Sequence, residues 1–144
     1  MTSSIRAFDR AQDAYNLAKK SAVQQKTVVF VVPKVRVGPF KAEVRFPWEG
    51  KIVDVYASTG TAGTTSTTIQ IEKCSQDDYD TVPVWVDVLA QAAVFDPNEK
   101  SLRTSSAPYA LADETVKAGD HFRINTLALG DGFQDLTLEI TIQI

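Results

Sequence analysis

Residues 46–73 constrain the fold most strongly, because two alternating segments there flank a loop of Thr, Ser, Gly and Ala. In a β-strand, every second side chain lies on the same face. The apolar face is expected to hold Val53, Val55 and Ala57 in the first segment and Ile69 and Ile71 in the second, with Asp54, Gln70 and Glu72 facing away. The pattern predicts a β-hairpin that projects a polar loop and contains no reactive group.

The same alternation of period 2 recurs along most of the remaining chain. Further strands are expected at 27–32, which is apolar on both faces, and at 42–46, 82–88 and 135–144. A phase slip between Asn125 and Leu127 predicts a β-bulge in another strand. Short strands at this spacing, separated by turn residues, favour a mainly β fold, an antiparallel β-sandwich over residues 26–144.

Residues 1–25 have a different pattern and predict one N-terminal α-helix, with Thr2, Ser3 and Ser4 at its start. At helical spacing one side gathers small and aromatic residues, namely Ala7, Phe8, Ala11, Ala14, Tyr15 and Ala18. Small side chains let another backbone approach closely, so this side is expected to be an interface. Two partners remain open: the sandwich of the same chain, or identical subunits in a homo-oligomer.

Length and charge exclude several classes of protein. The chain has 144 residues, which fits one domain, and 15 basic and 18 acidic residues give a net charge of −3. The charges are mixed along the chain, so neither a nucleic-acid interface nor an anionic-membrane anchor is expected. No apolar run approaches the roughly 20 residues that span a bilayer, so no membrane insertion is expected. Asp9 and Asp13 stand where a signal peptide needs an apolar core, so no signal peptide is expected.

No set of residues predicts catalysis, a cofactor or a metal site. Cys74 and His121 are the only cysteine and histidine; Cys74 is interpreted as a small buried thiol, and His121 as a surface residue on the outward face of its strand. The acidic run Asp77, Asp78 and Asp80 lacks the glycine and glutamate of a calcium loop, so it is interpreted as a solvated loop. The chain is therefore expected not to be an enzyme, since no pair of positioned carboxylates can be nominated either.

Aromatic residues suggest an alternative in a different functional class. Trp48, Trp85 and Tyr79 lie at predicted outward or loop positions, where a ring could contact a sugar or a protein partner. This supports the hypothesis of a carbohydrate-binding module that contacts host cell-wall glycan. The opposite interpretation is that Trp85 and Tyr56 lie beneath the N-terminal helix, since large exposed apolar patches are uncommon on monomers.

Several short motifs follow one another in a familiar order: a GxI strand, a GTAG loop, a strand ending in IxK, a VKAGD turn and a DLTLxIxI strand. The matching residues are Gly50, Ile52, Gly60, Gly63, Ile71, Lys73, Gly119, Asp120, Leu136 and Leu138. In this order the chain resembles tail and adsorption-apparatus proteins of long-tailed phages. It is similar to the shoulder domain of lactococcal phage receptor-binding proteins and to small tail-tip proteins of Bacillus-infecting siphophages.

The resemblance implies a non-enzymatic structural or adaptor component of a phage tail tip. It implies other phage tail proteins as partners, a location in the virion after synthesis in the host cytoplasm, and a homo-oligomer, often a trimer. Two departures matter: Lys73-Cys74-Ser75 stands where a Lys-Asn-Gly turn is common, and no head domain follows Ile144. Because the saccharide site of the receptor-binding relatives belongs to the head, no receptor-contacting residue is transferred to this chain.

Overall fold

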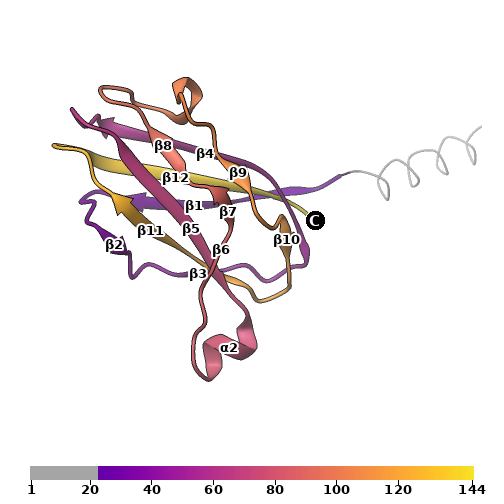
Figure 1. The fold of residues 1–144 in the computed structure, drawn as a ribbon. Coiled ribbons are helices and arrows are strands. Elements are labelled where there is room, and N and C mark those ends of the chain that lie inside the picture. Colours follow the sequence, from indigo (N-terminus) through magenta and orange to yellow (C-terminus); the bar gives the residue numbers. More distant parts are fainter. Residues whose placement is uncertain (1–22) are drawn as a thin grey trace, which may run out of the picture.

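The computed structural model describes residues 23–144, and over this range the chain is mainly β with antiparallel sheets, as predicted (Figure 1). The predicted helix interface, Ala7, Phe8, Ala11, Ala14, Tyr15 and Ala18, lies outside the described residues. One sheet has four strands in the order β1 (Gln25–Val32), β12 (Gln134–Gln143), β4 (Gly50–Thr61) and β10 (Thr115–Val116).

A second sheet is assembled around two long neighbouring strands, β11 (His121–Ala128) and β5 (Thr67–Cys74). The outer side of β11 pairs with β2 (Gly38–Pro39) and β3 (Val44–Arg45), and the outer side of β5 pairs with β6 (Val86–Asp87) and β8 (Ala93–Phe95). The remaining described elements are the pair β7 (Leu89–Gln91) and β9 (Ala110–Leu111), the short helix α2 (Gln76–Asp80) and the 3₁₀ turn η1 (Leu102–Thr104).

Both sheets contribute to one hydrophobic core. Phe30 and Leu138 come from the four-stranded sheet, and Ile71 and Phe122 come from the other. Each such side chain adds about 1.5–3 kcal/mol when it is fully buried. The core therefore joins the two sheets into one unit.

The last strand follows its predicted alternation. Leu136, Leu138, Ile140 and Ile142 are all buried, and β12 lies between β1 and β4 with hydrogen-bonded neighbours on both sides. Ile144, also expected on the buried face, comes after the end of β12 and is half-exposed. The predicted bulge is confirmed too, because the register of β11 against β5 shifts between Thr126 and Ala128.

The predicted hairpin over residues 46–73 is wrong. β4 pairs with β12 in the four-stranded sheet, whereas β5 pairs with β11 in the other sheet. The polar loop crosses between the sheets and is held to Asp131, since Thr64 N donates to Asp131 O at 2.9 Å and Asp131 N donates to Thr65 Oγ1 at 3.1 Å. Alternation predicts which face of a strand is buried but does not identify its hydrogen-bonded neighbour.

The buried face of β4 is also shifted at its start. Val53 is exposed while Ile52 is buried, because the register against β12 shifts between Thr141 and Ile142. A bulge places two residues opposite one, so the alternation before it is out of phase with the alternation after it. Val55 and Ala57 are buried as predicted.

Three further strand predictions were partly wrong: two of the strands are shorter than predicted, and a third is buried on one face only. In 82–88 only Val86–Asp87 pairs, and Val82, Val84 and Val86 are exposed. In 42–46 only Val44–Arg45 pairs, although Phe46 is buried. In β1 one face is buried, while Val29 and Val31 of the other face are exposed. Valine favours extended backbone at all these positions, but burial needs a covering layer.

Among the described residues, no helix is both long and apolar enough to cross a membrane.

Candidate functional site

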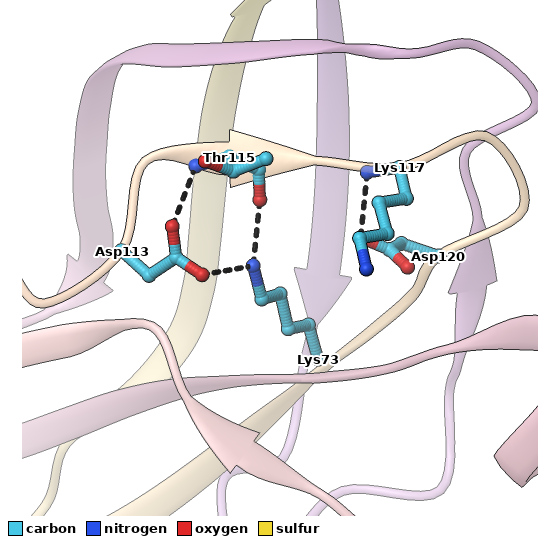
Figure 2. A network of polar contacts seen from close by, with 5 residues as sticks. All are labelled: Lys73, Asp113, Thr115, Lys117 and Asp120. Carbon is cyan, nitrogen blue, oxygen red and sulfur yellow. Dashed lines mark hydrogen bonds and ion pairs between the residues drawn. The ribbon is translucent and has the colours of Figure 1, made fainter.

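Lys73, the lysine of the IxK motif near the end of β5, is the centre of a polar network beside the VKAGD turn (Figure 2). Its Nζ donates to Asp113 Oδ2 at 2.9 Å and to the backbone oxygen of Thr115 at 2.6 Å. The ammonium thus ties β5 of one sheet to the segment that enters β10 of the other. Asp113 also accepts from Thr115 N at 2.9 Å, and these contacts with Lys73 and Thr115 lower the pKa of Asp113 to about 2.

The VKAGD turn beside this network is closed by its own aspartate. Asp120 Oδ2 accepts from Lys117 N at 2.9 Å, and Gly119 has φ +88°, which is unfavourable for residues with a Cβ. Gly119 N donates to Phe46 O and Phe46 N donates to Asp120 O, each at 2.8 Å. The turn predicted at Gly119-Asp120 is therefore anchored to the segment after β3.

A pocket of about 230 Å³ adjoins the network and is lined by Lys73, Asp113, Lys117 and Asp120 together with Val84 and Val86. Lys73 and Asp113 neutralise each other at this edge. Within residues 23–144 no group of three His, Cys, Asp or Glu side chains is arranged to hold a metal ion. The network therefore fixes a corner of the fold, and its geometry does not assemble a nucleophile with a base.

The second candidate feature is an aromatic cluster on the outer face of the β11–β5 sheet. Tyr79 of α2 stacks on His121 with ring centroids 3.8 Å apart and planes 5° apart, and Trp85 meets Tyr79 edge-on at 6.4 Å. The Arg123 guanidinium lies 4.1 Å from the centre of the Trp85 ring and pairs with Glu72 at 2.7 Å. A cation over an indole face is stabilising, so this contact holds the Trp85 ring against Arg123 of β11.

The interpretation of His121 as a surface residue is wrong, since only 7% of it is exposed. Its alternation does direct it away from the core, but α2 covers that outer face. Gln76 Oε1 of α2 accepts from Arg45 Nε at 2.6 Å and lies 3.3 Å from His121 Nε2. The imidazole is therefore a packing and hydrogen-bonding group beneath the helix.

The acidic run forms the helix α2, so its interpretation as a loop is also wrong. Ser75 caps the helix by accepting from Asp78 N at 3.2 Å, which satisfies one of the free amides of the first turn. Asp77, Asp78 and Asp80 are solvent-exposed, as predicted. Cys74, directly before the cap, is buried as predicted, and burial raises the pKa of its thiol.

The three predicted aromatic contact residues do not form one surface. Tyr79 and Trp85 lie in the same cluster, whereas Trp48 packs edge-on against Phe46 at 5.6 Å, with Lys26 Nζ 5.4 Å from its ring centre. Trp48 is 48% exposed, and Trp85 and Tyr79 are only partly so. Of the three rings, Trp48 is the most exposed and therefore the most available for stacking on a ligand.

A pocket that the sequence interpretation missed lies along the edge of β4. It has a volume of about 340 Å³, and its lining includes Asp54, Tyr56, Arg103 and Tyr109. Tyr109 OH accepts from Val55 N at 3.0 Å and donates to Asp54 Oδ1 at 3.2 Å, and burial raises the pKa of Tyr109. The alternation of Asp54 and Tyr56 could have indicated one wall, but η1 and residue 109 come from a part of the chain with weak signals.

Comparison with known proteins adds little to this geometry. No family model matches the chain, and no curated protein matches it. Two solved structures of turnip yellow mosaic virus align at TM-score 0.26 each, with 10% and 8% identity, covering 85% of this chain and 81% and 93% of theirs. A structure of Desmodium yellow mottle tymovirus aligns at TM-score 0.20 and 10% identity, covering 86% of this chain and 82% of its own. Likeness at this level supports neither a shared fold nor a shared function.

Proposed function

We propose that this chain is a non-enzymatic structural or adaptor component of a phage tail tip, built as an antiparallel β-sandwich. Its two sheets form the rigid layers, and its surface segments make contact with other tail proteins in the virion. The proposal starts from the ordered motifs that resemble phage tail proteins. Support comes from where those motif residues lie.

The motif residues stabilise the frame of the molecule. A Cβ at Gly50 would lie 2.6 Å from Gln143 O, and one at Gly60 would lie 2.9 Å from Asp135 Cβ, so neither position has room for a side chain. Lys73 links two sheets, and Ile52, Ile71 and Leu138 are buried in the core. This observation carries the proposal. Motif residues that pack the core and join the sheets favour a fold held in common with phage tail proteins over a catalytic activity held in common with them.

Immunogold electron microscopy of purified virions tests the proposed location. An antibody raised against the full chain is expected to label one end of the particle, at the tail tip. The same antibody, pre-absorbed with the purified chain, serves as the control for specificity and should label no particle. Label confined to the capsid, or absent from intact and detergent-opened particles, would exclude a tail-tip component.

A carbohydrate-binding module is the second candidate, and the β4 pocket favours it more than Trp85 does. Tyr56 and Tyr109 offer amphipathic rings, Asp54 accepts hydrogen bonds, and Arg103 donates them, which suits the hydroxyl groups and apolar faces of a sugar. A pocket of this mixed character is a default binding site. The ring of Trp85, in contrast, already contacts Arg123 and Tyr79 of the same chain.

A pull-down with purified host cell walls decides whether glycan binds at the β4 pocket or at the exposed ring of Trp48. Under this second hypothesis Arg103→Ala and Tyr56→Ala abolish saturable binding, whereas Trp48→Ala leaves it unchanged. Loss of binding with Trp48→Ala alone would move the site to that exposed ring. Absence of binding by the folded wild-type protein would end the carbohydrate hypothesis.

A further inference from the structure

Three exposed valines form an apolar ridge beside α2. Val82, Val84 and Val86 are 74%, 54% and 53% exposed, and we call them the valine ridge. The stretch 76–87 that contains the ridge also contains four aspartates, all exposed, and no lysine or arginine: Asp77, Asp78, Asp80 and Asp87. Of the two lysines behind the ridge, Lys73 is paired with Asp113, and Lys117 lines the same pocket as Asp78 and Asp120. The ridge is therefore an apolar surface on a stretch whose own charged residues are all acidic.

A complementary surface lies on residues 33–42. A pocket of about 430 Å³ is lined by Lys34, Arg36, Val37, Pro39, Phe40 and Lys41, and we call it the basic pocket. The stretch 33–42 contains no acidic residue, and Val37 of the pocket lining is 68% exposed. Its lining combines three apolar residues with three cations, so its charge is opposite to that of the stretch 76–87.

The two surfaces lie at opposite edges of one sheet. β6, which carries Val86, pairs with the outer side of β5, whereas β2, within the basic pocket, pairs with the outer side of β11. The order β2, β11, β5, β6 places β11 and β5 between them, as Figure 1 also indicates. A rigid sheet cannot bring its two edges together, so the ridge of one molecule can meet only the pocket of another.

We propose that this chain self-associates head to tail, with the valine ridge of one copy seated in the basic pocket of the next. Valine side chains contact the apolar part of the pocket lining, and the four aspartates of one copy face Lys34, Arg36 and Lys41 of its neighbour. Apolar contact supplies affinity, and charge complementarity fixes the orientation and suppresses wrong pairings. Such a heterologous contact closes into a ring or extends as a filament, depending on the rotation between copies. It goes beyond the proposed function and can be tested without a virion.

Sedimentation velocity of the full chain over a concentration series is the first measurement. The wild-type protein is expected to form species larger than a monomer, and the dissociation constant is expected to rise when salt increases from about 0.05 to about 0.5 M, because exposed charge pairs are screened. A ridge variant, Val84→Asp, and a pocket variant, Lys34→Glu with Arg36→Glu, should each weaken association by roughly tenfold or more. Val31→Asp, an equally apolar exposed position on β1, is the matched control and should associate like wild type.

Mixing the two variants distinguishes head-to-tail contact from symmetric pairing. The ridge variant keeps an intact pocket, and the pocket variant keeps an intact ridge, so an equimolar mixture should form a dimer that contains one copy of each. Circular dichroism of each variant verifies that it is folded before mixing. Dimers in the mixture, with monomers in both separate samples, are the expected signature.

Three results would overturn the proposal. A wild-type protein that stays monomeric at its highest soluble concentration shows that the surfaces do not join copies of this chain, even if another tail protein occupies them. Association that both variants retain assigns the contact to other residues. A mixture that stays monomeric, although wild type associates, shows a symmetric interface.

Discussion

At the scale of single residues, Asp113 offers a pH-dependent test of the Lys73 network. Its pKa is lowered to about 2 from an ordinary 3.8, so its contribution to stability is complete above about pH 4 and is lost as the pH falls through about 2. The pair is 2.9 Å long but the aspartate is half-exposed, so Asp113→Asn should reduce the free energy of unfolding at neutral pH by no more than about 1 kcal/mol. Urea denaturation at several pH values measures the difference, which should vanish near pH 2.

Glu114→Gln is the control for this change, because it removes a neighbouring charge whose ion pair with Lys51 is longer, at 3.5 Å, and exposed. A difference between wild type and Asp113→Asn that grows as the pH falls would contradict the assigned direction of the pKa shift.

A substitution at Gly50, the first of the motif residues, tests whether these residues are needed for packing. Gly50→Ala should lower the free energy of unfolding by about 1–3 kcal/mol, since the new methyl group would press on Gln143 O and on Ile142 Cγ2, 2.6 and 2.8 Å away. Lys51→Ala, at the next and exposed position of β4, should stay within about 0.5 kcal/mol of wild type. Equal denaturation curves for Gly50→Ala and wild type would remove the packing role given to this glycine.

At the scale of elements, the two tryptophans are expected to behave differently. Trp85 lies between Arg123 and Tyr79, so Trp85→Ala should uncover the outer face of the β11–β5 sheet and lower the free energy of unfolding by about 1–3 kcal/mol. Trp48→Ala, at a half-exposed ring, should cost less than about 1 kcal/mol. Guanidinium denaturation of both variants makes the comparison, and a larger loss for Trp48→Ala would reverse the assignment.

Elements also show how far local sequence can predict this fold. β12 and the bulge in β11 follow from alternation, because one face of each strand is buried in the core and the period is enforced by that burial. The partners of β4 and β5 do not follow, since period 2 reports a face and not a neighbour. His121 and Val82 were misjudged for a related reason: the layer that covers the outer face includes α2 but does not extend over the ridge, and a local pattern contains no information about that layer.

The candidate sites were predictable only in part. Tyr79 and Trp85 were singled out from sequence and do meet, but their contact with Arg123 and His121 depends on how α2 folds back after Ser75. The basic pocket and the valine ridge combine residues that are unremarkable one at a time. Their positions at opposite edges of one sheet follow from the strand order, which the local sequence does not contain.

At the scale of the whole molecule, the two sheets share one core, the isoleucines and leucines of the motifs pack within it, and the two edges of one sheet carry the valine ridge and the basic pocket. A structural component should be present in a fixed number of copies per particle, whereas a protein that only assists assembly or infection should not. The head-to-tail contact adds that the copy number exceeds one. Both statements concern the particle and can be measured on it directly.

Quantitative mass spectrometry of purified tails, separated from heads and calibrated against the major tail protein, measures whether this chain is a structural component of the tail. The chain is expected to co-purify with the tails at a constant ratio of several copies per tail. Repeated absence of its peptides from purified tails, while they are abundant in the infected-cell lysate, would contradict the claim.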